Sequence, residues 1–291
     1  MIGPKIFAVV AASFAVGALL MLLQRSSDIA SSHTSWGKFA GYAVLLIALL
    51  GVAQLSGALY ALSCGAIVAL ALNEFATGAR IRPNLRYALG AEFLLLAAAA
   101  LTAGETALYT CAVSVSLLAL TTGALAHDPR RGVRQAIWSV IGIIAVATPG
   151  AHLLLLTTRP ERFPLFAFLV LVVCCSDAFA DLVGRRWPIG RGVLRASPEK
   201  SISGLAAGLG TALIMSLVLG AVTGLWPPWR AAVYGMCIAV AASTGDLIAS
   251  SLKRTFNIKD FGTALGDHGG VLDRFDSLIF AAWPFYWLIR G

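Results

Sequence analysis

The sequence predicts an all-α, polytopic integral membrane protein with about ten transmembrane helices, on three observations. Of its 291 residues, 58% are hydrophobic and 12% are charged, whereas soluble proteins carry about 25% charged residues. The mean hydropathy is +0.83. Apolar runs close to the roughly 20 residues that cross a bilayer as a helix recur along the whole chain. These observations exclude a soluble enzyme with a single membrane anchor.

Pro and Gly mark the loops between the predicted helices. In chain order the predicted spans are 6–23, 39–55, 57–74, 87–104, 106–126, 136–157, 163–183, 203–225, 230–252 and 277–290. The first span follows Lys5, as in a signal peptide, but residues 24–27 offer no small-x-small cleavage site, so we expect a retained helix or an uncleaved signal anchor. The division of 39–74 into two helices is the least determined. The long segments outside the bilayer are 184–203 and 255–276.

The basic residues predict the orientation of the chain. With these spans, 17 of the 22 Lys and Arg residues lie in loops on one side and five on the other, which places the basic loops in the cytoplasm. We therefore expect a multi-pass protein of the cytoplasmic (inner) membrane. The net charge of +8 suits anionic head groups or nucleotides. However, any multispan protein needs this bias to insert, so the bias alone does not indicate a ligand.

The cysteines do not form a metal-binding motif in the sequence. All five lie inside apolar runs without CxxC spacing or a nearby His, namely Cys64, Cys111, Cys174, Cys175 and Cys237. We expect them to act as small buried apolar residues, and we expect no zinc site.

Several carboxylates occupy positions that are costly in a membrane. Asp177 and Asp181 are one helical turn apart and share a face. Asp246 lies inside an apolar run, where a central Asp costs about 2.5 to 3.5 kcal/mol to insert. Such residues need a partner, a cavity or a metal ion. Two alternatives stay open: Asp246 as a neutral acid in a helix–helix hydrogen bond, and the Asp177–Asp181 pair as an interfacial cap.

A second group of carboxylates begins the last helix. Asp273 and Asp276, at spacing i, i+3, present two carboxylates to one point if the final helix starts there. Oxygen ligands of this kind suit Mg²⁺, which takes one or two carboxylates and fills its shell with water and substrate phosphate.

Basic and flexible residues lie next to these acids. Ser250, Lys253 and Arg254 follow Asp246 at i+4, i+7 and i+8, so they lie on one face toward the cytoplasm. In the following loop, glycines permit tight bends that turn N–H groups toward an anion, with His268 as a further donor; these glycines are Gly262, Gly266, Gly269 and Gly270. A metal site beside a cationic, glycine-bearing loop indicates phosphoryl or nucleotidyl transfer.

The C-terminal residues resemble a known family. The pattern Ser250-x-Leu252-Lys253-Arg254, Lys259-Asp260, Gly262, Leu265-Gly266 and His268-Gly269-Gly270-Val271-x-Asp273-Arg274-Phe275-Asp276 closely resembles the signature of the phosphatidate cytidylyltransferases, or CDP-diacylglycerol synthases. Upstream, "SDAFADLVGRR", "RASPEKSISG" and "ALNEFATG" are similar to the family's Asp-bearing helix, its Ser-Pro-x-Lys loop and an early helix ending in Glu. The resemblance is dense over residues 174–290 and faint before them. We therefore expect residues 161–291 to carry the signature and residues 1–160 to form a scaffold within one membrane-embedded unit.

The resemblance implies a reaction and a set of site residues. The reaction is CTP plus phosphatidate giving CDP-diacylglycerol and pyrophosphate, with Mg²⁺ held by Asp246, Asp273 and Asp276 and room for a second cation. The implied catalytic residues are Asp246, Lys253, Arg254, Lys259, Asp260, His268, Asp273 and Asp276. The implied substrate-binding residues are Asp177, Asp181, Ser197, Lys200, Ser250, Gly269, Gly270 and Arg274.

The chain departs from the family pattern in three places. Gly266-Asp267 stands where Pro-Gly is usual, and Ser201-Ile202-Ser203-Gly204 lacks an aromatic residue and an acid. A first helix also precedes the family's usual start. These departures affect the expected lipid more than the reaction type.

The expected partners are CTP, phosphatidate or a related lipid phosphate, and the bilayer, with no nucleic acid; a homodimer is left open. Two alternatives from other classes remain. One is a CTP-dependent lipid kinase or a cytidylyltransferase acting on another lipid phosphate, which the products distinguish. The other is a secondary transporter, since intramembrane carboxylates also couple ions, although we find no inverted repeat and the charges lie near the cytoplasmic end.

Overall fold

The described part of the chain is entirely helical. The computed structural model describes residues 2–23, 43–44, 46–54, 56–193, 197–264 and 269–290, and no β-strand occurs among them. The helices are α1 (Gly3–Leu23), α3 (Gly57–Gly78), α4 (Pro83–Ala124), α5 (Pro129–Gly142), the π-helix η1 (Ile143–Ala147), α6 (Thr148–Thr157), α7 (Arg162–Arg186), α8 (Ile202–Thr223), α9 (Pro228–Phe256) and α10 (Leu272–Arg290). The all-α prediction is confirmed.

The predicted number of membrane spans is not confirmed. In the described residues, six helices are long and apolar enough to cross a membrane: α3, α4, the continuous α5–η1–α6 helix, α7, α8 and α9. α4 contains two of the predicted spans, which meet at a bend where Gly104 has a φ of +77°. α10 carries Asp273, Arg274 and Asp276 in its first two turns, which lowers its apolar character.

Two helices begin earlier than the sequence predicted, and a cap explains the first of these boundaries. Asp128 caps α5 by accepting a hydrogen bond from the Arg131 N–H, and Pro129 occupies the first turn. α5 therefore begins seven residues before the predicted position 136 and takes Arg130, Arg131 and Arg134 into a helix. α10 begins at Leu272 rather than 277, so Asp273 and Asp276 are helical residues one turn apart.

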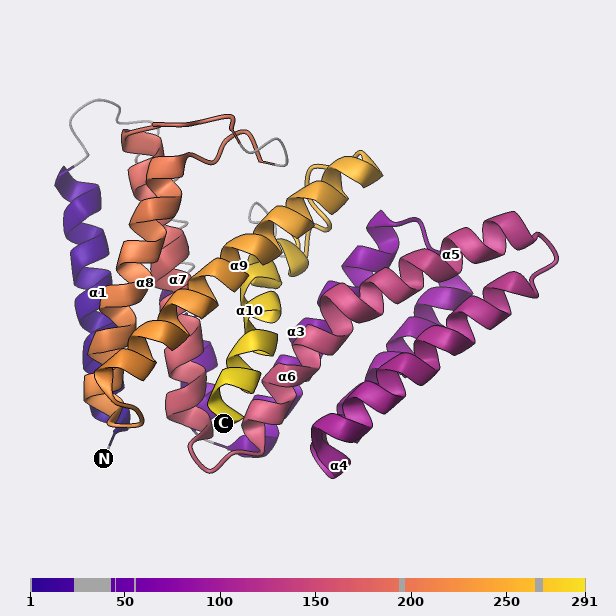
Figure 1. Cartoon of the computed structure of the whole chain (residues 1–291), viewed down its shortest axis with the longest axis horizontal. Helices are drawn as coiled ribbons and strands as arrows, with labels where there is room; N and C mark the ends of the chain where they lie inside the picture. Colours follow the sequence, from indigo (N-terminus) through magenta and orange to yellow (C-terminus); the bar gives the residue numbers. More distant parts are fainter. Residues whose placement is uncertain are drawn as a thin grey trace.

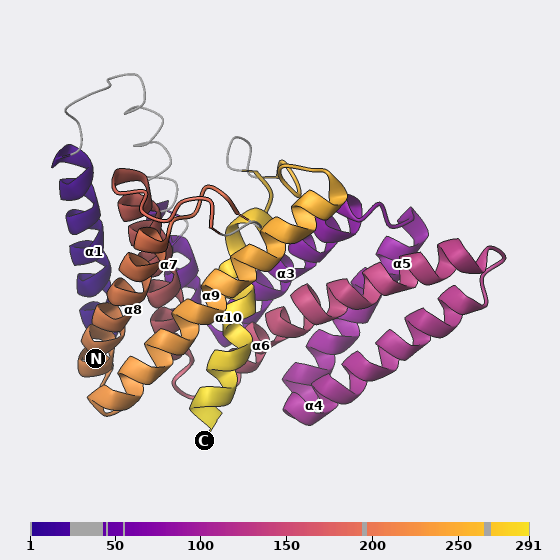
Figure 2. The ribbon, with the colours of Figure 1, turned by 45° about the horizontal axis from the view of Figure 1, so that its top comes forward.

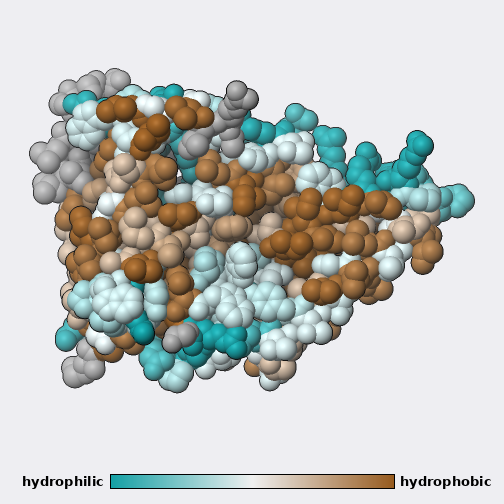
Figure 3. All heavy atoms as spheres, in the orientation of Figure 1, coloured by the Kyte–Doolittle hydropathy of each residue, from teal (hydrophilic) through white to brown (hydrophobic). Residues whose placement is uncertain are grey.

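The helices are arranged with two distinct ends. In Figure 1 the α3–α4, α7–α8 and α9–α10 connections lie along the upper edge, while the α6–α7 and α8–α9 connections and the ends of α1 and α10 marked N and C lie along the lower edge. Figure 2 shows the same two ends after rotation, with the two arms of α4 meeting near its label. In Figure 3 apolar side chains cover the middle of the molecule and hydrophilic ones gather along the upper right and lower edges. The chain is a multi-pass membrane protein.

Small residues let the helices around the site approach closely. A side chain at Gly204 on α8 would meet the Ala180 carbonyl of α7, and one at Gly245 on α9 would meet Phe280 of α10, each with its Cβ within 2.5 Å. Small residues at such crossings are how membrane helices pack backbone to backbone. As a result α7 packs closely against α8, and α9 packs closely against α10.

The cysteines differ in part from the expectation. All five are free thiols, and Cys64 is buried, but Cys174 is exposed on α7. The expectation of buried thiols is confirmed for Cys64 but not for Cys111, Cys175 and Cys237, which are partly exposed. It was wrong for Cys174, because an apolar run that spans a membrane has an outward face as well as an inner one.

Candidate active site

Asp246 of α9 forms the first pair of the candidate site. Its carboxylate forms an ion pair with the Lys200 ammonium group, and both side chains are 33% exposed. The Ser250 hydroxyl donates a 3.4 Å hydrogen bond to Asp246 Oδ1. The Ser250 contact follows from the i, i+4 spacing on α9, as the sequence predicted. The Lys200 contact depends on the position of the α7–α8 loop.

That loop positions Lys200 through a turn. The Lys200 N–H donates to the Ser197 carbonyl at 3.1 Å, and Pro198 follows Ser197, as expected for a β-turn with Pro at its second position. Ser201 then caps α8, accepting a 3.1 Å hydrogen bond from the Gly204 N–H. The helix cap is therefore present although this stretch lacks the aromatic residue and the acid of the family pattern.

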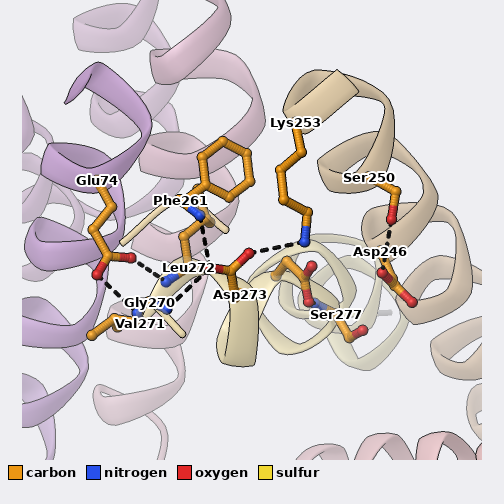
Figure 4. Close-up of polar contacts among 11 residues, drawn as sticks. Glu74, Asp246, Ser250, Lys253, Phe261, Gly270, Val271, Leu272, Asp273 and Ser277 are labelled. Carbon is orange, nitrogen blue, oxygen red and sulfur yellow. Dashed lines mark hydrogen bonds and ion pairs between the residues drawn. The ribbon is translucent and has the colours of Figure 1, made fainter. Parts of the chain in front are cut away.

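Asp273 of α10 has the most complete set of partners in the site. Its Oδ1 binds Lys253 Nζ at 2.9 Å, and its Oδ2 accepts hydrogen bonds from the Phe261 N–H at 2.8 Å and the Gly270 N–H at 3.0 Å. Its side chain is only 5% exposed. Figure 4 shows this carboxylate between Lys253 and the two backbone amides. Asp273 thus joins α9, α10 and both ends of the glycine-bearing loop.

Two more carboxylates lie near this pair of contacts. Asp177 of α7 interacts electrostatically with Asp246 and Lys200 and lies near Ser277. Asp276 interacts with Asp246 and Lys253, and its Oδ1 accepts a 2.6 Å hydrogen bond from the Ser277 N–H. Four carboxylates from three helices therefore share two lysines. This excess of negative charge attracts cations.

Several of the predicted site residues lie outside the carboxylate cluster. Asp181 is exposed and pairs with Arg185 at 2.6 Å, so it is separated from Asp177. Arg254, Lys259 and Asp260 are exposed, and the side chains of Arg254 and Lys259 form no ion pair within the described ranges.

The other predicted residues belong to the loops or lie outside the described residues. Gly269 has a φ of +80°, which only glycine adopts readily, and Asp260 Oδ1 lies beside it. Arg274 is half-buried at the start of α10. His268, with Gly266 and Asp267, lies outside the described residues.

Glu74 is the site residue that the sequence interpretation did not assign. It lies near the end of α3, is 8% exposed, and accepts hydrogen bonds from the Val271 and Leu272 N–H groups at 3.0 and 2.8 Å. The stretch "ALNEFATG" already placed an acid in an apolar helix. Its partners, however, lie 197 and 198 residues away and could not be identified from spacing.

The oxygen-rich cluster fits a hard divalent cation by its chemistry. Within the described ranges, no three His, Cys, Asp or Glu side chains converge closely enough to form a metal cage by themselves. Mg²⁺ does not need such a cage, because it uses one or two carboxylates together with water and substrate phosphate. Asp276 Oδ2 accepts no hydrogen bond from the described residues, and Asp246 lies within electrostatic range of it. Asp273 is less available, since both of its oxygens are engaged.

Of two cavities in the described residues, the smaller reaches a carboxylate of the cluster and the other does not. A groove of about 280 Å³ runs along the outer face of α9 and is lined by Thr244, Leu247, Ile248, Ser251, Leu252 and Thr255. A void of about 20 Å³, enough for one water molecule, lies between η1, α9 and α10 and reaches Asp276. Asp177 is exposed and Asp246 is partly exposed, so the cluster opens at the molecular surface.

Comparison with known proteins identifies the family. The sequence profile of the cytidylyltransferase family matches residues 37–290. The chain belongs to the cytidylyltransferase family. The match contains every residue of the cluster and leaves α1 outside it. The extra first helix noted in the sequence therefore precedes the cytidylyltransferase region.

Relatives of this chain include named enzymes. The chain is 34% identical over 179 residues to the uncharacterized protein YnbB of Escherichia coli, covering 60% of each chain. It is 35% identical over 190 residues to a phosphatidate cytidylyltransferase of Synechocystis, covering 61% of this chain and 62% of that one. It is 31% identical over 162 residues to a phosphatidate cytidylyltransferase of Rickettsia bellii, covering 53% and 70%. The match thus spans about three fifths of the first two relatives, and the resemblance seen in the sequence is confirmed.

Proposed function

We propose that this protein transfers the cytidylyl group of CTP to phosphatidate, giving CDP-diacylglycerol and pyrophosphate. The observation that carries the proposal is the cluster of Asp177, Asp246, Asp273 and Asp276 with Lys200 and Lys253 at one end of an apolar helical bundle. Such a site can bind a polyanionic nucleotide beside a lipid head group. The named relatives support the choice of substrates.

The reaction needs little covalent chemistry from the protein. An oxygen of the lipid phosphate attacks the α-phosphorus of CTP, the bond from that phosphorus to the bridging oxygen breaks, and pyrophosphate leaves with the electron pair. The protein's part is to position the two phosphates and neutralise charge. Lys200 and Lys253 are the cations in the cluster, and each now pairs with an aspartate that phosphate oxygens can replace. Arg254 and Lys259 are exposed toward the same end and complete the proposed triphosphate contacts.

We propose Mg²⁺ as the cofactor, held by Asp246 and Asp276, with Asp273 joining when Lys253 turns to a phosphate. When bound, Mg²⁺ supplies charge neutralisation for the phosphate oxygens. The proposed ligands come from different helices and meet only in the folded chain. Asp246→Asn or Asp276→Asn is expected to abolish most turnover at limiting Mg²⁺, and near-normal activity of either variant at limiting Mg²⁺ contradicts the assignment.

The lipid is proposed to enter sideways, near Asp177 and Asp246. The phosphatidate head group must reach CTP while its acyl chains stay in hydrocarbon. Neither Asp177 nor Asp246 is sealed inside the protein, which supports this route. The active site is proposed to face the cytoplasm, because the basic loops lie at the same end of the molecule.

The deciding experiment is a product assay. Purified protein in detergent is incubated with CTP, Mg²⁺ and a panel of lipid phosphates and lipid alcohols, with Asp246→Asn protein as the control. A CDP-lipid with pyrophosphate is expected, fastest with phosphatidate. A phosphorylated lipid with CDP indicates a CTP-dependent lipid kinase instead, and a CDP-lipid formed only from another lipid phosphate replaces the proposed substrate.

A further inference from the structure

Glu74 connects the early helices to the start of α10. Its two carboxylate oxygens accept one hydrogen bond each, Oε1 from the Val271 N–H at 3.0 Å and Oε2 from the Leu272 N–H at 2.8 Å. The side chain is 8% exposed. Figure 4 shows Glu74 reaching from α3 toward the segment that leads into α10.

The start of α10 needs an acceptor from elsewhere in the fold. The first N–H groups of a helix have no partner within the helix, and a Ser, Thr, Asp or Asn just before the helix usually accepts from one of them. Here Val271 occupies that position and has no polar side chain. Glu74 takes over the capping, and its negative charge lies at the positive end of the helix dipole.

Two glycines make room for this carboxylate. An ideal Cβ at Gly262 would lie 2.4 Å from Glu74 Oε1, and one at Gly270 would lie 2.4 Å from Glu74 Oε2. Any larger residue at either position would displace Glu74 or the loop. The Gly270 N–H meanwhile donates to Asp273. The loop is therefore held by two carboxylates, Asp273 from α10 and Glu74 from α3.

We propose that Glu74 is a positioning residue for the cytidylyl transfer. By holding the first turn of α10, it fixes Asp273 and Asp276 relative to Asp246 and Lys253 on α9. In this role Glu74 acts through the backbone of Val271 and Leu272 and not by contact with substrate or metal. The inference rests on the proposed function for its kinetic part, whereas the contact on which it depends can be tested without activity.

The test uses Glu74→Gln in the full-length protein. The amide has nearly the same shape, but an NH₂ donor replaces one of the two carboxylate oxygens, so one of the two N–H groups loses its acceptor. Amide hydrogen exchange of Val271 and Leu272 is expected to accelerate. At a temperature well below the melting temperature of every variant, kcat is expected to fall by about tenfold or more, with a smaller change in the KM for CTP.

The matched control is Glu105→Gln. Glu105 holds the other end of α10, accepting a hydrogen bond from Tyr286 Oη at 2.8 Å and binding Arg290 at 2.8 Å. Both substitutions remove charge from a tertiary anchor of the same helix. A purely structural role predicts that both variants lose stability and keep their kcat. Positioning predicts that only Glu74→Gln loses kcat.

Each outcome bears on the inference. Faster exchange with unchanged kcat overturns the positioning role, and unchanged exchange at Val271 and Leu272 overturns the contact itself. If the wild-type protein forms no CDP-lipid, the proposed function fails, but the exchange result still supports or overturns the contact. If Glu74→Gln does not insert, Gly262→Ala displaces the same carboxylate and is expected to lower kcat likewise; a normal kcat in folded Gly262→Ala protein counts against the inference.

Discussion

Asp177 and Asp181, one helical turn apart on α7, have different surroundings. Asp177 interacts with Asp246, Lys200 and Ser277, whereas Asp181 pairs with Arg185 at the surface, where both side chains are more than half exposed. An exposed i, i+4 ion pair contributes only about 0.3 to 0.5 kcal/mol. Removing the two carboxylates is therefore expected to have different effects on activity.

This difference gives the first prediction at the residue scale. Asp177→Asn is expected to lower kcat/KM for the lipid about tenfold or more, since it changes the charge beside Asp246 and Lys200. Asp181→Asn is expected to change kcat/KM by less than about twofold, because it removes only an exposed pair. Steady-state kinetics in mixed micelles measure both. Equal losses in the two variants would show that the shared helical face, and not the tertiary neighbourhood, determines their roles.

A second residue-scale prediction concerns Arg254. A guanidinium group binds two phosphate oxygens in a fixed geometry, whereas an ammonium group acts as a movable point charge. Arg254→Lys is therefore expected to lose activity although the charge is kept, and Lys259→Gln is expected to raise the KM for CTP or lower kcat. The measurement is the dependence of the rate on CTP concentration, on protein shown to insert normally. Unchanged kcat and KM in both variants would remove these residues from the site.

At the scale of the elements, close helix crossings set the geometry of the site. Gly245 precedes Asp246 on α9, and an ideal Cβ on Gly245 would lie 2.5 Å from Phe280 Cβ and 3.2 Å from the Asp276 carbonyl oxygen of α10. The crossing therefore holds two acidic residues of the cluster at a short separation. By contrast, Gly210 on α8 has no neighbour within 4 Å of its ideal Cβ.

These two glycines form a matched pair for a prediction. Gly245→Ala is expected to destabilise the protein by about 1 to 3 kcal/mol through overpacking and to lower kcat, because α10 must move away from α9. Gly210→Ala is expected to be neutral or slightly stabilising, since alanine favours a helix. Thermal unfolding in detergent, followed together with kcat, checks both. If Gly245→Ala changed neither the thermal stability nor kcat, α9 and α10 would approach each other less closely than they do in this structure.

At the scale of the whole molecule, charge and hydropathy divide the protein into layers. The apolar middle in Figure 3 lies between hydrophilic edges. In the described residues, the connections at one end carry most of the Lys and Arg residues, while Lys5, Arg159, Arg162, Arg230 and Arg290 lie toward the other. The candidate site lies at the end that carries more positive charge, and the positive-inside rule predicts that this end faces the cytoplasm.

Cysteine labelling tests this orientation. In a variant without the five native cysteines, a cysteine at Arg131 is expected to be protected from a membrane-impermeant maleimide in intact cells, and a cysteine at Pro160 is expected to react. Both reporter positions are exposed on the protein surface. Permeabilised cells, in which both should react, provide the control. The reverse pattern would place the site on the outer side and contradict the use of cytoplasmic CTP.

The sequence alone predicts the all-α membrane class, most helix positions within a few residues, the family, and the acidic and basic residue types of the candidate site. These features depend on local composition, on the length of apolar runs and on spacings along a single helix, as with Asp246 and Ser250. Only the tertiary structure decided which charges meet. In the folded chain Lys200 pairs with Asp246 and Lys253 pairs with Asp273. Asp181 lies at the surface, and Glu74 lies at the start of α10. The physical reason is that most of these contacts join different helices. They depend on how closely the helix backbones approach and on which side chain reaches an otherwise unpaired group. The spacing of residues along the sequence contains neither kind of information.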